Sequence, residues 1–164
     1  MHSTDFVLLE EDHTVLTDIL DRLRQEANAK LSFLLDRNGQ QLARSGELDG
    51  VDPTSLASLA AGNVAATDGL AKLIGETEFS ILFHEGDSDH LHITLVDPKA
   101  ILVIRFDEYS SLGLVRLRVK QALAELEERM QIVMTRPTDG SATGSGVSPF
   151  AEITDEDIDN LFSV

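Results

Sequence analysis

The stretch FSILFHEGDSDHLHITLVDPKAILVIRF (residues 79–106) decides the fold. It contains three runs rich in aliphatic and aromatic residues, at 79–84, 90–96 and 100–106. Such runs favour β-strands, and the clusters EGDSD and DPK between them consist of residues that favour turns. We therefore expect three consecutive strands that form a meander.

A hairpin precedes this meander. The segment LSFLLDRNGQQLARSG (31–46) has two short runs, at 31–36 and 40–45, on either side of Asn38 and Gly39. An Asn-Gly pair suits a tight hairpin turn because both positions tolerate positive φ. The two hairpin strands bring the expected antiparallel sheet to about five strands.

Three further segments show helical periodicity. Residues 8–27 place leucine and isoleucine at helical spacing, with charged residues between them. The second segment, 53–74, has Asp52 as its N-cap and ends at Gly75. The third runs from residue 110 or 111 to about 135 with one apolar stripe. The order α-ββ-α-βββ-α predicts an α+β sandwich, in which helices cover a five-stranded antiparallel sheet.

Composition excludes several classes of protein and of site. The chain has 164 residues, a formal net charge of -16 and no cysteine. A field of that sign repels phosphate backbones and anionic lipids, so we expect neither a nucleic-acid nor a membrane partner. The absence of cysteine excludes disulfides and thiolate metal sites. Because the first residues lack the basic and apolar regions of a signal peptide, we expect a cytoplasmic protein.

The chain divides into three parts. We expect a domain at 1–136, a flexible linker at 137–148 (PTDGSATGSGVS) and a short acidic amphipathic helix within 149–164, capped by Thr154. A helix this short is not stable alone in water, so we expect it to fold in a groove of a partner. The alternative is a solubilising acidic tail. The residues expected to make the contact are Phe150, Ile153, Ile158, Leu161 and Phe162.

The second helix has two unlike sides. At about 100° per residue, bulky side chains gather on one side and small ones form an i, i+4 row on the other. We expect the bulky side to pack on the sheet and a second subunit or a partner to cover the small row. The alternative is burial of the whole helix by the other two helices. The bulky set is Leu56, Leu59, Leu70, Leu73 and Ile74; the small set is Ala57, Ala61, Ala65 and Gly69.

Catalytic motifs are missing from the sequence. The segment GSATGSG follows no expected strand and opens no helix, so it does not fit a phosphate-binding loop, and no G-x-S-x-G elbow occurs. We expect no catalytic centre and no cofactor. His84, His90 and His92 surround one turn, where they could bind Zn²⁺ or Cu²⁺. The simpler interpretation, which we adopt, is a polar hairpin end without metal.

Several segments together resemble one known family. They are DPTSLASLAAGNVAATDGLAKLIGE (52–76), FHEGDSDHLHITLV (83–96), SSLGLVRLRVKQA (110–122) and SPFAEITDEDIDNLF (148–162). With the expected element order, they resemble the bacterial Roadblock family (dynein light chain-like), whose members regulate small Ras-like GTPases. The likeness spans almost the whole chain.

The resemblance implies how such a protein works. It implies a homodimer in which the third strands pair edge to edge and the second helices lie side by side. It also implies that the dimer binds a GTP-bound GTPase across those helices and accelerates hydrolysis without inserting an arginine finger. On matching positions, Ala61, Ala65 and Gly69 would form the main interface, and the tail would contact a second site, with or without aid to nucleotide exchange.

Two alternatives to this interpretation stay open. One is a scaffold or adaptor of the same fold that binds a GTPase without accelerating it. The other is a sensory domain whose histidines bind a metal or small ligand.

Overall fold

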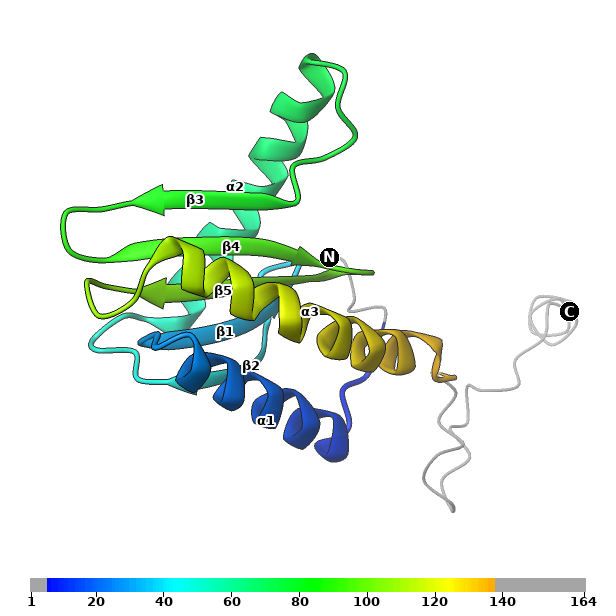
Figure 1. The fold of residues 1–164 in the computed structure, drawn as a ribbon. Helices are drawn as coiled ribbons and strands as arrows, with labels where there is room; N and C mark the ends of the chain where they lie inside the picture. The colour runs from blue at the N-terminus through cyan, green and yellow to red at the C-terminus, as the bar shows by residue number, and fades with distance from the viewer. Residues whose placement is uncertain (1–5, 138–164) are drawn as a thin grey trace, which may run out of the picture.

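The computed structural model describes residues 6–137, and its element order is the predicted one (Figure 1). The predicted linker and tail helix lie almost wholly outside the described residues, so the proposed division of the chain stays a prediction. The elements are α1 (Glu10–Glu26), β1 (Leu31–Asp36), β2 (Gln41–Gly46), α2 (Pro53–Leu73), β3 (Ile81–Glu85), β4 (His90–Val96), β5 (Ala100–Phe106) and α3 (Leu112–Thr135).

The sheet has the order β2-β1-β5-β4-β3, and all neighbouring strands are antiparallel. The β1–β2 turn follows from its sequence. Gly39 has a φ of 87°, which glycine adopts without strain, and Oδ1 of Asp36 accepts hydrogen bonds from the backbone N–H groups of Asn38 and Gln40, both at 2.9 Å. A Cβ at Gly39 would lie 3.2 Å from Cα of Ser58, so the turn packs tightly against α2.

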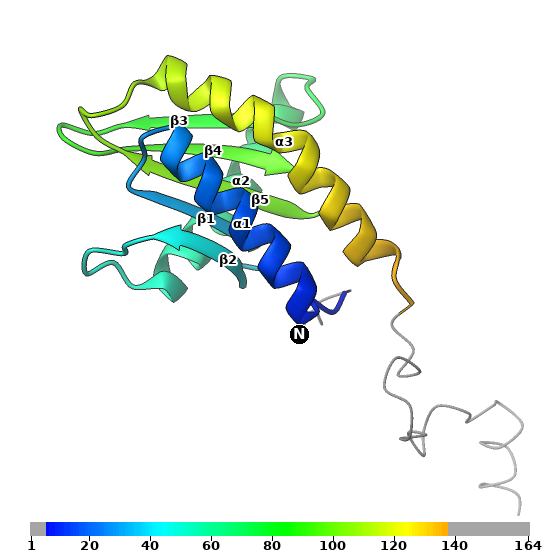
Figure 2. The same ribbon diagram turned by 60° about the horizontal axis from the view of Figure 1, so that its bottom comes forward.

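Helices cover both faces of the sheet. Figures 1 and 2 show α1 and α3 side by side on one face and α2 on the other. Because side chains alternate along a strand, β5 contributes to two separate cores. Leu102 and Ile104 are buried with α1 and α3, whereas Ile101 and Val103 are buried with α2.

An ion cluster fastens the end of α3 to the start of α1. The Asp12 side chain is fully buried, and its carboxylate accepts hydrogen bonds from Arg129 (Nη1 to Oδ1, 3.2 Å) and Arg136 (Nη1 to Oδ2, 2.6 Å). It also accepts one from the backbone N–H of Leu9 at 2.9 Å. The bond from Arg136 is the main reason why the pKa of Asp12 is lowered.

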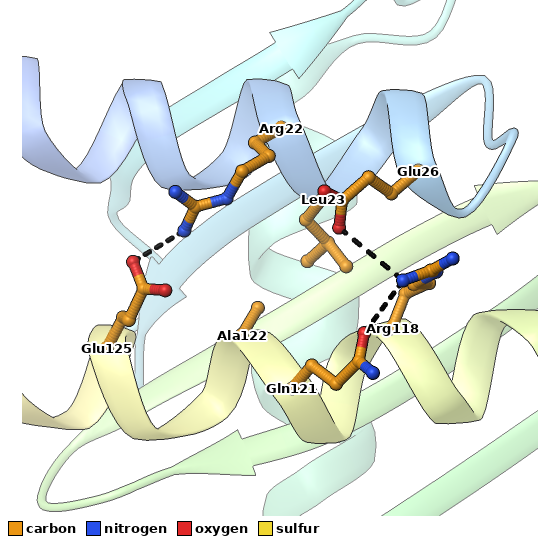
Figure 3. A pocket seen from close by; sticks show the side chains of 7 residues that line it. All are labelled: Arg22, Leu23, Glu26, Arg118, Gln121, Ala122 and Glu125. Carbon is orange, nitrogen blue, oxygen red and sulfur yellow. Dashed lines mark hydrogen bonds and ion pairs between the residues drawn. The ribbon is translucent and has the colours of Figure 1, made fainter.

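Farther along, the groove between α1 and α3 is closed by paired charges (Figure 3). It has a volume of about 240 Å³. Arg22 bridges to Glu125 at 2.5 Å, and Arg118 approaches Glu26 at 4.0 Å. Each arginine therefore has a carboxylate partner on the opposite helix.

Candidate functional site

A group of strongly exposed aliphatic side chains lies on α2 and at its C-cap, next to the partly exposed apolar residues of β3. Leu59, Leu70, Leu73 and Ile74 are 60–82% exposed. The predicted orientation of α2 is therefore wrong, because its bulky side faces outward; of the bulky set, Leu56 alone is partly buried against the sheet. We call these four residues and the strand β3 the apolar edge.

The small residues of α2 face the sheet instead. Ala57, Ala60, Ala61 and Val64 are each at most 8% exposed and pack in one core with the fully buried Phe33. Large side chains on the strands already fill the space under the helix, so small side chains on α2 let its backbone approach. The volume of the strand residues decides which side of α2 faces the sheet. The sequence pattern of the helix alone does not contain this information.

Only the first half of α2 lies on the sheet. The buried side chains up to Val64 belong to the sheet core, and Figure 1 shows the second half extending past β3. Leu70 and Leu73 therefore have no strand beneath them. This geometry, rather than a lack of hydrophobicity, keeps them exposed.

The predicted contact residues are divided by this orientation. Ala61 is 8% exposed and lies in the core against the sheet, so its expected place on the outer surface is wrong. Ala65 and Gly69 are exposed, and a Cβ on Gly69 would meet no atom within 4 Å. The structure adds Gly62, whose Cβ position is equally open. Leu59 also lies on this outer side. The same helical pattern predicts this position if the bulky side, and not the small side, is assigned to the surface.

The strand β3 forms one edge of the sheet. It pairs with β4 on one side and is last in the strand order among the described residues. An edge strand presents unpaired backbone N–H and C=O groups, which can pair with a strand of another chain. The apolar edge therefore combines exposed side chains with free backbone hydrogen-bonding groups.

The three histidines around the β3–β4 turn do not converge. His84 lies opposite Leu91, on the α2 side, and its Nε2 lies 3.2 Å from Nδ2 of Asn63. His90 accepts a hydrogen bond from the N–H of Gly86 at 3.2 Å. His92 is buried on the other side, and burial, with a smaller effect of Arg116, lowers its pKa to about 4. Within residues 6–137 no three His, Asp or Glu side chains are grouped to hold a metal ion.

Arg37 lies beside α2, a position that its neighbours in the sequence did not predict. Arg37, in the β1–β2 turn, approaches Asp68 of α2 at 3.9 Å and Glu78 at 3.6 Å. Both partners are carboxylates of the same chain. Arg37 therefore ties the hairpin to α2 and to the segment that leads into β3.

Comparison with known proteins agrees with this architecture. The Roadblock/LC7 domain profile matches residues 15–106. The chain belongs to the Roadblock/LC7 family. The fold and the family resemblance expected from sequence are thus confirmed.

Solved structures of this family are similar to the chain in sequence and in fold. MglB of Myxococcus xanthus is 50% identical over 81% of this chain and 99% of its own, with a TM-score of 0.74. The gliding protein MglB of Thermus thermophilus is 33% identical over 80% and 99%, with a TM-score of 0.73. A structure of MglB with a tetrameric arrangement is 32% identical over 80% and 99%, with a TM-score of 0.75. No curated protein sequence matches the chain.

Among residues 6–137, no helix has both the length and the apolar character needed to cross a membrane.

Proposed function

We propose that this protein is a GTPase-activating regulator of a small Ras-like GTPase of the MglA type. It would act as a cytoplasmic homodimer in cell polarity and motility, located at one pole of the cell. The observation that carries the proposal is the exposed apolar outer side of α2 in a chain otherwise rich in surface charge. Patches of this kind on soluble domains mark interaction sites.

The second half of α2 and the strand β3 fit the homodimer. Pairing of two β3 strands would satisfy their free backbone groups and continue the sheet into a second copy. Leu70, Leu73 and Ile74 are exposed on and directly after the half of α2 that extends past β3, and a second copy of α2 would cover them. The small number of charged residues on this helix suits such burial.

The outer side of the paired helices would receive the GTPase in its GTP-bound form. Ala65 and Gly69 are exposed there, with Gly62 and Leu59 on the preceding turns. Small side chains permit close approach of a partner backbone, and Leu59 offers an apolar anchor. Ala61 supports this surface from below by setting the distance between helix and sheet.

Activation would proceed without an arginine finger. No arginine or lysine occurs between Pro53 and Thr67, and Arg37 beside the helix is engaged by Asp68 and Glu78. A regulator that binds one conformation of the GTPase more tightly shifts its population. The catalytic groups would then be those of the GTPase, brought into position by the complementary surface of α2.

The carboxyl-terminal segment would contact the GTPase at a second site. Phe150, Ile153, Ile158, Leu161 and Phe162 lie outside the described residues, so this part rests on their sequence pattern. Tethering by the linker would hold the segment at high effective concentration near a GTPase already bound to α2. Aid to nucleotide exchange would be a further action of this segment.

Single-turnover GTP hydrolysis by the cognate GTPase tests the activator proposal. We expect a saturating amount of this protein to raise the rate and the Gly69→Arg variant to leave it at the intrinsic value. Ala124→Arg, on an exposed position of α3, is a matched control that should activate normally. An unchanged rate with the unaltered protein, despite measured binding, would favour the adaptor alternative.

A further inference from the structure

The face of β3 on the α3 side is uncovered. Phe83 stacks at 6.2 Å on Phe106, which belongs to the α1/α3 core, so Phe83 and its neighbour two positions back, Ile81, share this face. They are 38% and 46% exposed. Figure 1 shows α3 lying across β4 and β5, with β3 beyond it. An apolar strip therefore runs between β3 and α3.

Two contacts show that α3 runs alongside β4 in the same direction. At the start, Leu112 lines one cavity of about 310 Å³ together with His90. Toward the other end, the carboxylate of Glu127 accepts a hydrogen bond from the N–H of Asp97 at 3.4 Å. Successive turns of α3 therefore lie beside successive residues of β4.

This alignment places two cations beside the apolar strip. Arg116 is close enough to His92 to help lower its pKa, and His92 lies opposite Phe83 in the strand pair. Lys120 is one helical turn farther on the same flank, level with Ile81. We call the surface made by Ile81, Phe83, Arg116 and Lys120 the β3–α3 lane.

Both cations of the lane are free. In the described part of the chain, neither Arg116 nor Lys120 forms an ion pair or a side-chain hydrogen bond, and both are exposed. By contrast, Arg22 of α1 and Arg118 of α3, which face the groove between these two helices, have glutamate partners (Figure 3). The lane thus combines an apolar surface on β3 with two unpaired positive charges on the adjacent side of α3.

The two ends of the lane are acidic. Glu85 and Glu108 line the cavity near the start of α3, and Glu127 follows Lys120 by two turns. These acidic ends repel an acidic ligand. Its carboxylates are therefore confined to the helical turn of α3 that carries Arg116 and Lys120. A suitable occupant is short, acidic at one end and apolar along one edge.

We propose that the carboxyl-terminal segment, residues 149–164, docks in the β3–α3 lane of its own chain. Its apolar residues Ile158, Leu161 and Phe162 would pack on Ile81 and Phe83. Its acidic residues Asp155, Glu156, Asp157 and Asp159 would face the two cations. The docked segment buries apolar surface on both sides and pairs charges that the domain leaves unpaired.

The length of the connecting chain supports docking in the same molecule. A flexible Gly/Ser-rich chain as long as residues 137–153 would have a root-mean-square span of about 21–25 Å. Lys120 and Arg136 are separated along α3 by about 24 Å at the helical rise per residue. The connecting chain starts next to Arg136, which Asp12 holds in place. Effective concentration is highest when span and separation agree.

Docking would give the segment two competing positions. A segment held in the lane is not available to a partner on the α2 side, so a partner that recruits it must first displace it. The intramolecular site does not depend on the proposed GTPase activity, and its test needs no GTPase.

Paramagnetic relaxation measures the docking directly. The chain has no cysteine, so Ser163→Cys provides a unique site for a nitroxide spin label in the full-length protein. We expect the amide signals of Ile81, Phe83, Arg116 and Lys120 to broaden selectively relative to that of Leu59 on the opposite face. Equal broadening on both faces, or none, would overturn the proposal.

Two controls separate docking from general collapse and from exchange between chains. Lys120→Glu should abolish the selective broadening, whereas Arg44→Glu, with the same change of charge at an exposed position of β2, should preserve it. Dilution of the spin-labelled, isotope-labelled chain with an excess of unlabelled, spin-free chain should leave the broadening unchanged. Its loss on dilution would assign the segment to the lane of a second copy and contradict the proposal.

Discussion

The two halves of α2 have different surroundings. From Pro53 to Val64 the helix lies on the sheet and buries alanine and valine; from Ala65 to Leu73 it passes the sheet edge and exposes leucines. In the first half small residues are buried against large strand residues, while Leu59 is exposed on the outer side. In the second half Leu70 and Leu73 are exposed and Ala71 is buried. Burial on this helix follows the side on which a residue lies more than the size of its side chain.

The largest expected effect on stability comes from comparing two alanines of α2 one helical turn apart, one buried and one exposed. Ala61→Arg forces a long charged side chain into the packed core and should reduce the free energy of unfolding by about 3 kcal/mol. Ala65→Arg, on the exposed side, should change it by no more than about 0.5 kcal/mol. Urea unfolding at one protein concentration measures both. Equal destabilisation would show that both alanines are buried.

A second contrast sets a buried histidine against an exposed one. The pKa of His92 is lowered from 6.5 to about 4, so protons bind the unfolded chain more readily between these values. Stability should therefore fall as pH decreases through this window, by about 1–2 kcal/mol at pH 5 from this group. Urea titrations at pH 7 and pH 5 should show that loss reduced in His92→Gln and retained in His84→Gln. The same pH dependence in both variants would argue against burial of a neutral His92.

The positions of helices and strands could be predicted from sequence because the signals are local. The Asn-Gly turn, the acidic turn before β4 and the Asp52 and Ser111 caps each act within a few residues. The Asp52 carboxylate, for example, accepts the N–H of Ser55 at 3.1 Å, as its position before Pro53 indicates. Local chemistry of this kind places element ends without knowledge of the tertiary fold.

The orientation of α2 could not be predicted in the same way. A helical pattern shows that two sides differ, but which side meets the sheet depends on Phe33 and its neighbours, more than 20 positions earlier. The buried cluster of Asp12 was missed for a similar reason, since Arg129 and Arg136 are more than 100 positions away. Asp12 alone resembles any exposed acid in the first turn of a helix.

A smaller effect tests whether a second copy covers the outer half of α2. Leu73→Ser with Ile74→Ser should leave the monomer fold intact because both side chains are exposed. We expect the dimer dissociation constant to rise about tenfold, equivalent to about 1.4 kcal/mol. Sedimentation equilibrium measures it, with Leu117→Ser on the exposed face of α3 as the control. A dissociation constant unchanged by the double variant would remove these residues from the dimer interface.

The most direct test of the central claim is the affinity of the GTP-bound GTPase for variants of the outer side of α2. Isothermal titration calorimetry should show that Gly69→Arg abolishes complex formation, while Ala124→Arg binds as tightly as the unaltered protein. Far-ultraviolet circular dichroism of both variants should match that of the unaltered protein, because a Cβ at Gly69 meets no atom within 4 Å. Undiminished binding by Gly69→Arg would contradict the placement of the GTPase on α2.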